Sequence, residues 1–307
     1  MAEKLARIFS VERFAIHDGA GIRTTVFFKG CPLQCAWCHN PEGIAAQRQV
    51  LYMEKKCIHC GSCVQAAQMG GVRLAKNNRL CLDMRQAEDW DRLLDICPTG
   101  ALAWDSWQTS LDELLQTVLR DEVFFRHGGG VTASGGEPLL QADFLQAFLS
   151  RLQAQGVHTA LESSLQVPLK ELQKVLPHLD QIYADCKLWD SQQHRCWTGQ
   201  DNVRLRENIR WLLQSAFRSK VVIRTPMIPG ITAIDENIAA IADFLRQCWP
   251  ESRYELLNYN PLAPAKYSLL QKRYGLQQNL PRYTKAELIH FAAAAKRQGL
   301  RRVSFIA

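Results

Sequence analysis

The sequence predicts an α/β protein with a parallel β-sheet covered by helices. From residue 110 onward, strand-like segments alternate with segments whose apolar residues recur at helical spacing. The strand-like segments are almost continuously apolar, as is typical of strands buried on both faces of a parallel sheet. There are about six or seven such units, fewer than a closed eight-fold barrel needs. At 307 residues and 47% hydrophobic content, the chain is long enough for one large domain with an insertion or for two ordinary domains.

The first expected strand lies within residues 17–28 and delivers a cysteine-rich loop from its C-terminal end. A capping box of Ser110 and Glu113 begins one helix, and Thr284 with Glu287 begins the last. The other helices are expected around residues 144–152, 209–217 and 234–245. The other strands are expected at residues 130–134, 157–161, 181–187, 220–224, 253–259 and 302–306.

Charge and hydropathy exclude several classes of protein. The formal charge of +7 is spread along the chain, without the basic stripe that marks a nucleic-acid groove. A surface of this charge suits docking of an acidic redox partner. No apolar run approaches the roughly 20 residues that span a bilayer, and residues 1–4 lack the order of a signal peptide. We therefore expect a cytoplasmic protein, acting as a monomer, that binds neither nucleic acid nor membrane.

Eleven cysteines in a cytoplasmic protein favour metal ligation over disulfides, and seven of them form two groups. The first group is Cys31, Cys35 and Cys38. A 4Fe-4S cluster normally takes four protein thiolates, so a loop that offers three leaves one iron free to bind another molecule. The alternatives are a zinc site with a fourth ligand from elsewhere, or a disulfide with a spare thiol.

The second group lies in residues 51–103, which differ in character from the later part of the chain. Cys57, Cys60 and Cys63 have C-x2-C-x2-C spacing, and Cys97 starts a C-P-x-G-A-L segment, as in half of a bacterial ferredoxin. These four form a complete ligand set for a second 4Fe-4S cluster with no open iron. Cys81 is then a vestige or an alternative fourth ligand, and a zinc ribbon is the competing interpretation. We expect a ferredoxin-like insertion at residues 51–103 within a domain of residues 1–50 and 104–307.

The first cysteine loop resembles the C-x3-C-x-Φ-C motif of the radical S-adenosylmethionine (SAM) enzymes, with Trp37 as the aromatic Φ. Further motifs resemble the activating enzymes of glycyl radical enzymes, especially the long forms with an extra-cluster insertion. These motifs are D-G-x-G-I-R at residues 18–23, C-H-N-P at 38–41, S-G-G-E-P at 134–138, D-x-K at 185–187 and I-R-x-P-x-I-P-G at 223–230. The resemblance implies a partial (β/α)6 TIM barrel with the cluster at its C-terminal mouth.

The resemblance also implies roles for residues at the ends of later strands. It assigns Trp37 to the adenine, Glu137 to the SAM amino group, Lys187 to the SAM carboxylate and Asn260 to the ribose, where many relatives have histidine. Asp185, with Glu162 and Ser163, would hold a monovalent cation beside SAM, and Asp18 would face the protein substrate. The complete expected cofactor-binding set is Trp37, Cys38, His39, Gly135, Gly136, Glu137, Glu162, Ser163, Asp185, Cys186, Lys187 and Asn260.

The implied activity is hydrogen-atom abstraction from a backbone glycine of a partner glycyl radical enzyme. Flavodoxin or ferredoxin would supply an electron, with the second cluster as a candidate relay, and SAM would be cleaved to methionine and a 5′-deoxyadenosyl radical. The alternatives are another radical SAM enzyme that modifies a peptide or nucleotide, and a two-cluster electron carrier. The three-ligand loop separates the carrier from the enzymes, because a carrier has no use for an open iron.

Overall fold

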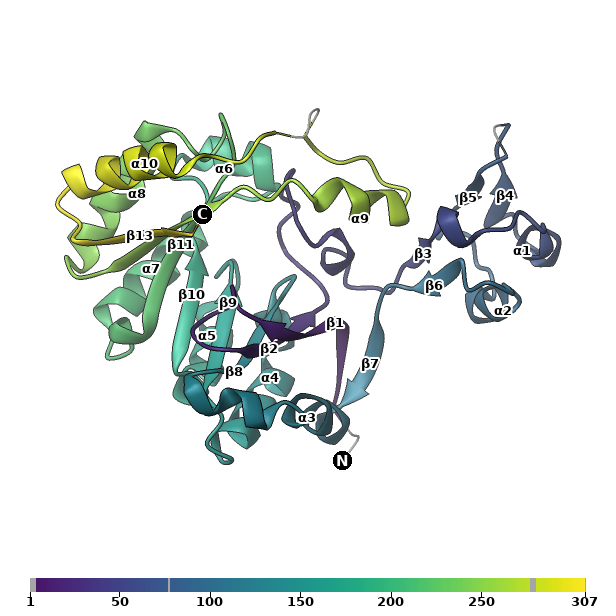
Figure 1. The fold of residues 1–307 in the computed structure, drawn as a ribbon, viewed down its shortest axis with the longest axis horizontal. Helices are drawn as coiled ribbons and strands as arrows, with labels where there is room; N and C mark the ends of the chain where they lie inside the picture. Colours follow the sequence, from purple (N-terminus) through teal and green to yellow (C-terminus); the bar gives the residue numbers. More distant parts are fainter. Residues whose placement is uncertain (1–3, 77, 277–279, 307) are drawn as a thin grey trace.

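The computed structural model describes residues 4–76, 78–276 and 280–306, so residues 1–3 of the N-terminus lie outside it. Within the described residues, a nine-stranded sheet runs in the order β13-β12-β11-β10-β9-β8-β2-β1-β7 (Figure 1). Its strands are β1 Leu5–Ala15, β2 Arg23–Phe28, β7 Trp107–Ser110, β8 Gly130–Gly135, β9 Thr159–Ser163, β10 Gln181–Asp185, β11 Val221–Met227, β12 Arg253–Asn258 and β13 Arg302–Ile306.

The strands β2 and β8 to β13 are parallel to one another, which confirms the predicted α/β fold with a mostly parallel sheet. β1 and β7 add two antiparallel strands at one edge. The expected parallel strands all form, with ends that move by up to three residues. β1 was not predicted, because its exposed Glu12, Arg13 and Phe14 interrupt the apolar pattern.

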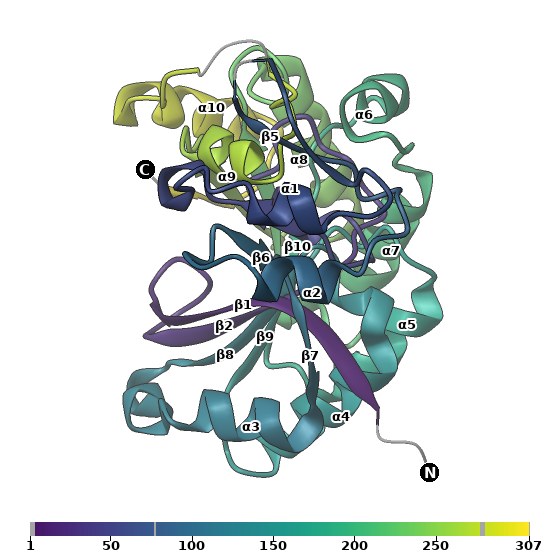
Figure 2. The ribbon, with the colours of Figure 1, turned by 90° about the vertical axis from the view of Figure 1, so that its right-hand side faces the viewer.

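Helices cover the sheet, and Figure 2 shows α4, α5 and α7 along one side of it. Both predicted capping boxes are present, at the starts of α3 and α10. The helix expected over residues 209–217 ends at Gln214, and Phe217 lies beyond it although it packs on the main core. The helices of this part are α3 Leu111–Leu119, α4 Ala142–Gln153, α5 Leu169–Val175, α6 Ser191–Thr198, α7 Val203–Gln214, α8 Asp235–Cys248, α9 Ala263–Leu269 and α10 Lys285–Arg297. Short 3₁₀ helices are η1 Pro41–Gly43, η2 Glu54–Lys56, η3 Glu122–His127, η4 Pro138–Gln141, η5 Leu176–His178 and η6 Arg218–Lys220.

Residues 50–104 form a side lobe that projects from the sheet in Figure 1. Its first and last strands pair antiparallel, with Val50 opposite Trp104. The side lobe has its own small apolar core, which includes Trp90 and Leu93. Its elements are β3 Val50–Tyr52, α1 Ser62–Ala66, β4 Val72–Leu74, β5 Leu80–Leu82, α2 Trp90–Asp95 and β6 Leu102–Trp104.

A buried arginine joins three strands at the end of the sheet opposite the cysteine loop. Arg23 has no exposed surface, and its guanidinium donates to Thr132 Oγ1 at 2.6 Å and to the Val131 carbonyl at 2.8 Å. It also lies 3.3 Å from His158 Nδ1. Burial, and then the Arg23 charge, lower the pKa of His158. Arg23 therefore has a structural role in joining β2, β8 and β9.

We expect the His158 contact to make stability fall as the medium becomes acidic. Because the folded-state pKa of His158 lies below its unfolded value, the unfolded chain binds the proton more tightly, and stability is lost as pH falls below about 6.5. His158→Gln should remove this part of the pH dependence between pH 7.5 and 5.5. The effect should stay below about 1 kcal/mol, because the half-exposed ring is screened by solvent. Thermal unfolding of both proteins at the two pH values measures it, and equal pH dependence would contradict the assignment.

Candidate functional site

The first cysteine loop continues from the C-terminal end of β2. Backbone hydrogen bonds hold it on two sides: Cys31 N donates to the Ile44 carbonyl at 3.0 Å, and Ala36 N donates to the Trp197 carbonyl at 2.9 Å. Cys38 N donates to the Cys35 carbonyl at 2.9 Å and so closes a turn. The loop is thus fixed by the main chain, and its three thiols remain available as ligands.

Gly136 lets the loop after β8 pass directly against the cysteine loop. Its N–H donates to the Phe28 carbonyl at 2.8 Å, and the next N–H, of Glu137, donates to the Gly30 carbonyl at 2.7 Å. A Cβ atom on Gly136 would lie 2.2 Å from the Gly30 carbonyl oxygen. Only glycine fits this close approach, which is a local packing reason for one glycine of the G-G-E motif.

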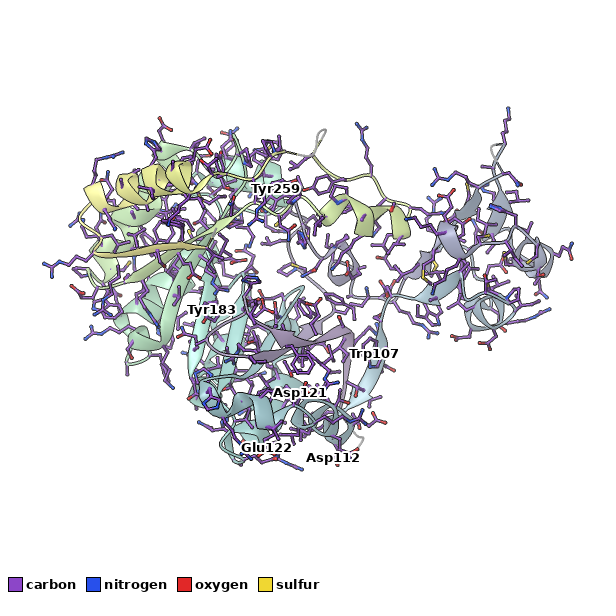
Figure 3. All side chains as sticks on the ribbon, in the orientation of Figure 1. Trp107, Asp112, Asp121, Glu122, Tyr183 and Tyr259 are labelled. Atoms are coloured by element: carbon purple, nitrogen blue, oxygen red, sulfur yellow. The ribbon has the colours of Figure 1, made fainter. Side chains whose placement is uncertain are left out.

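A cavity of about 310 Å³ opens beside the three cysteines, at the C-terminal ends of the parallel strands. In Figure 3 its lining extends from Tyr183 on β10 to Tyr259 just after β12. Ligand sites of α/β sheets commonly lie at this end of the strands. The sequence-predicted residues on the lining are Cys31, Cys35, Trp37, Cys38, His39, Gly135, Gly136, Glu162, Ser163, Asp185, Lys187 and Asn260.

An ion pair from β10 and the residues after it lies in the cavity wall. Lys187 Nζ lies 2.7 Å from Asp185 Oδ2, as the two-residue spacing predicted, and Lys187 is only 7% exposed. Burial alone would lower the pKa of Lys187, but the charge of Asp185, its hydrogen bond and the charges of nearby cysteines together outweigh burial and raise the pKa. The site therefore keeps a buried cation, positioned to bind a carboxylate.

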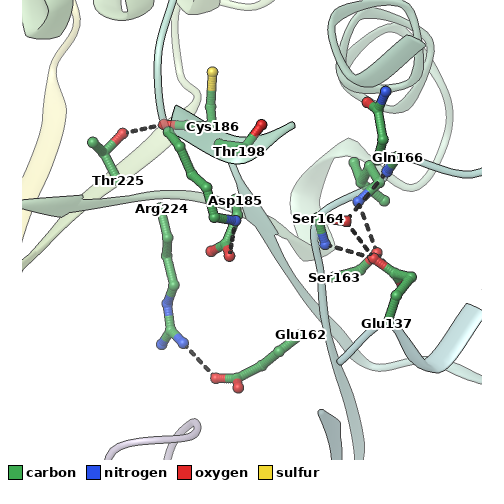
Figure 4. Close-up of polar contacts among 12 residues, drawn as sticks. Glu137, Glu162, Ser163, Ser164, Gln166, Asp185, Cys186, Thr198, Arg224 and Thr225 are labelled. Atoms are coloured by element: carbon green, nitrogen blue, oxygen red, sulfur yellow. Dashed lines mark hydrogen bonds and ion pairs between the residues drawn. The ribbon is translucent and has the colours of Figure 1, made fainter. Parts of the chain in front are cut away.

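A second ion pair lies deeper in the wall, where Arg224 of β11 points toward Glu162 of β9 (Figure 4). Arg224 Nη1 lies 2.7 Å from Glu162 Oε1, its Nε lies 2.7 Å from Glu255 Oε2, and its guanidinium covers the Tyr183 ring at 3.5 Å. Burial, and then the nearby Asp18 charge, raise the pKa of Glu162 to about 7. In this structure Glu162 already forms an ion pair with Arg224.

His39 and Asn260 meet at another side of the cavity. Burial lowers the pKa of His39, and a side-chain hydrogen bond with Asn260 opposes that effect. His39 Nε2 is buried and has no hydrogen-bond partner among the described residues. An unpaired buried polar nitrogen is costly, so a ligand in the cavity that could bond to this atom would be favoured.

Comparison with known proteins identifies the family of this chain. The sequence profile of the radical SAM superfamily matches residues 25–245, which is more than half of the chain. The chain belongs to the radical SAM superfamily. An indoleacetate decarboxylase activating enzyme of Tractidigestivibacter scatoligenes is 37% identical over 96% of both chains. A pyruvate formate-lyase 2-activating enzyme of Escherichia coli is 35% identical over 97% of this chain and 92% of its own length.

These relatives place this radical SAM protein among the activating enzymes of glycyl radical enzymes. A solved domain of a pyruvate-formate lyase-activating enzyme from Bacteroides vulgatus aligns with 59% of this chain and 100% of the domain, at 26% identity and a TM-score of 0.48. Membership of the superfamily implies a 4Fe-4S cluster and SAM as cofactors. No helix in the described part of the activase is long and apolar enough to cross a membrane.

The structure places two predicted cofactor-binding side chains of the activase away from the cavity. Glu137 is fully buried, and its carboxylate accepts hydrogen bonds from Ser163 Oγ at 2.8 Å, Ser164 Oγ at 2.6 Å and Ser164 N at 2.8 Å (Figure 4). It therefore joins the ends of β8 and β9, and its side chain is not among those that line the cavity. Cys186 is also fully buried and packs in the main apolar core, because it points to the opposite face from Asp185 and Lys187.

The other predicted cysteines of the activase converge in the side lobe. Cys57, Cys60, Cys63 and Cys97 line one small cavity between α1 and the segment after α2. Cys81 lines a different groove on the other side of Leu80. Cys97 therefore lines the same cavity as the other three cysteines, and Cys81 does not.

The described residues contain no group of three or more His, Cys, Asp or Glu side chains placed to hold a single metal ion. This geometry does not test a four-iron cluster, because each thiolate of a cube binds a different iron and the thiolates do not converge on one point. Burial raises the pKa of the Cys38 thiol to about 12 and also raises that of the Cys31 thiol.

The predicted partner-facing residue of the activase, Asp18, lies in the turn between β1 and β2 and is half-buried. Its Oδ2 accepts from Thr25 Oγ1 at 2.6 Å, and its carbonyl accepts from Thr132 Oγ1 at 2.8 Å. Gly21 permits this turn, since its φ is +69° and a Cβ there would lie 2.4 Å from Gly129 N. The D-G-x-G pattern is therefore explained by packing of the turn on the loop before β8.

Sequence reasoning missed several lining residues of the activase cavity, among them Tyr183, Arg224 and Tyr259. Tyr183 lies two residues before Asp185 on β10 and shares its face, so the same two-residue period could have identified it. Arg224 was noticed only as part of a motif. An arginine that directly follows the apolar run Val221–Ile223 in a buried strand indicates a paired cation. Tyr259 gave no local signal, because its place in the cavity depends on the turn after β12.

Proposed function

We propose that this chain activates a glycyl radical enzyme with SAM bound at a 4Fe-4S cluster on Cys31, Cys35 and Cys38. The single observation that carries the proposal is that these three thiols share one cavity with the buried Lys187–Asp185 pair. When bound, the cluster would supply the one electron that cleaves SAM to methionine and a 5′-deoxyadenosyl radical, and that radical would become 5′-deoxyadenosine when it takes a hydrogen atom from the partner. Abstraction of a hydrogen atom from a backbone glycine of the partner follows from the family.

The cavity suits the chemistry of SAM. Lys187 would pair with its carboxylate, and the buried ring of Trp37 would pack near its adenine. Asn260 and the unpaired Nε2 of His39 would form hydrogen bonds with polar groups of SAM. Because Glu137 is fully bonded to two serines, we assign the SAM amino group to the backbone of Gly135 and Gly136.

A monovalent cation beside SAM would take Asp185 and Glu162 as ligands, with Ser163 next to them. Glu162 would then have to exchange its ion pair with Arg224 for the cation. Such an exchange replaces the positive charge of Arg224 beside Glu162 by that of the cation, so the Glu162 carboxylate would keep a counter-charge.

We propose that the side lobe is the ferredoxin-like insertion of residues 51–103 within a domain of residues 1–50 and 104–307. The paired β3 and β6 at its base and its separate core support this division. Its four cysteines around one cavity support a second 4Fe-4S cluster, which would transfer electrons from flavodoxin or ferredoxin. The turn at Asp18 would face the protein substrate, with the exposed Ile16 and Ile22 beside it.

The test is anaerobic reconstitution followed by electron paramagnetic resonance (EPR) spectroscopy of the reduced protein with and without SAM. Two clusters predict about 8 Fe per chain. Addition of SAM should change the spectrum of one cluster, because only an open iron can bind it, and 5′-deoxyadenosine should form. A spectrum that SAM leaves unchanged would favour an electron carrier and overturn the proposal.

A further inference from the structure

A large basic groove lies between the side lobe and the segment that contains α9. Its volume is about 1100 Å³, and its lining includes six basic side chains and the single acidic side chain of Glu54. The basic side chains are Lys55, Lys56, Arg79, Lys266, Lys272 and Arg273. The groove therefore carries a local surplus of five positive charges, although the sequence suggested that the charge is spread along the chain.

The structure leaves part of this charge without a protein partner. Glu54 pairs with Arg79 at 2.6 Å, and Lys266 pairs with Glu42 at 2.9 Å. Lys55, Lys56 and Arg273 are exposed and make no ion pair with any other described residue. A concave surface with a local excess of one charge raises the rate of encounter with a partner of the opposite charge.

The groove lies next to the four-cysteine cavity, and the apolar side chain of Leu80 belongs to the lining of both. Lys56, in the groove, directly precedes Cys57. The two walls of the groove are also fixed to each other: Gln271 Nε2 donates to the Leu80 carbonyl at 2.6 Å, and Leu82 N donates to Gln271 Oε1 at 2.9 Å. A protein in this groove would therefore lie next to the second set of cysteines at a fixed geometry.

We propose that the groove is the docking surface for an acidic one-electron carrier protein, which reduces the side-lobe cluster past Leu80. This inference rests on the proposed function, because it needs a redox centre on Cys57, Cys60, Cys63 and Cys97. One electron passes from the reduced carrier to that centre, so the carrier is oxidised and the cluster is reduced without bond formation. The partner is identified by its negative charge, its redox chemistry and a convex face that fits the groove.

The experiment compares the reconstituted wild type with Lys55→Glu/Arg273→Glu, which reverses one exposed charge on each wall. The rate of reduction by reduced flavodoxin is followed by absorbance without SAM, at low and high ionic strength. We expect the second-order rate at low ionic strength to fall by about tenfold or more and its salt dependence to flatten. Titration with oxidised flavodoxin should show weaker binding by a similar factor.

Lys170→Glu/Arg204→Glu is the matched control, because both residues are exposed and the charge change is the same. Its flavodoxin rate should stay within about twofold of the wild type. Reduced methyl viologen, a small cation that needs no docking, should reduce the groove variant as fast as the wild type. An unchanged flavodoxin rate, an equal loss in the control, or a loss with methyl viologen would overturn the proposal.

Two further results separate this inference from the proposed function. Because the assay contains no SAM, absence of SAM cleavage would refute the proposed function and leave the flavodoxin result interpretable. If the groove variant keeps its flavodoxin rate but binds the glycyl radical enzyme more weakly, the groove serves the protein substrate and the electron-carrier proposal is wrong.

Discussion

Cys35→Ala is expected to reduce formation of 5′-deoxyadenosine from SAM to the background of iron-free protein. Cys35 is buried at the base of the cavity beside Lys187, and its loss leaves the loop with two thiols. Two thiolates cannot hold a four-iron cluster that leaves only one iron open. The measurement is anaerobic incubation with dithionite and SAM, with the product quantified by chromatography and the iron content determined in parallel.

Cys60→Ala is the matched variant in the side lobe. Cys60 is exposed and belongs to the other set of cysteines, so its loss should lower total iron while SAM cleavage with dithionite continues at a reduced level. The contrast tests the division of labour between the two cysteine sets. Unimpaired SAM cleavage by Cys35→Ala would refute the assignment of the first loop, whatever Cys60→Ala does.

Local sequence patterns were sufficient to predict the strands that are buried along their whole length. The run Thr24–Phe28 and the run Val221–Ile223 are apolar enough on both faces to indicate parallel strands, and the structure confirms them. β1 was missed because its N-terminal half is buried while Glu12, Arg13 and Phe14 are exposed. An edge region with one solvated side has no continuous apolar run to recognise.

The site was predictable where side-chain direction follows from strand period. Asp185 and Lys187 were expected on one face and lie 2.7 Å apart. The same rule places the side chain of Cys186 on the opposite face, in the core, so its expected place in the binding set stays a prediction. Glu137 shows the limit of motif reasoning, because three of its four hydrogen bonds come from Ser163 and Ser164, which only the fold brings next to it.

A buried ion pair at the base of the side lobe should have the largest effect on stability. Lys29 Nζ lies 2.6 Å from Asp105 Oδ2, and neither side chain has any exposed surface. Burial lowers the pKa of Lys29, and Asp105 opposes that effect. Asp105→Leu would leave the Lys29 ammonium buried without its counter-charge, which costs about 3–5 kcal/mol of the free energy of unfolding.

The melting temperature should accordingly fall by roughly 10 °C, as followed by circular dichroism. Lys29→Met/Asp105→Leu removes both charges and should recover at least half of the loss, since an apolar pair needs no counter-charge. Asp243→Leu, which breaks the exposed pair with Arg246, should cost less than about 1 kcal/mol. A double variant no more stable than Asp105→Leu would show that the loss comes from packing and not from the unpaired charge.

The position of this pair gives it a consequence beyond stability. Lys29 immediately precedes the Gly30–Cys31 start of the first cysteine loop, and Asp105 follows β6, where the chain leaves the side lobe. Asp105 Oδ1 also accepts from Gln49 N at 2.9 Å, at the point where the chain enters the side lobe. The pair therefore ties the first cysteine loop to both connections of the side lobe, and Asp105→Leu should lower iron retention in both cysteine sets together, whereas Cys60→Ala lowers it in one.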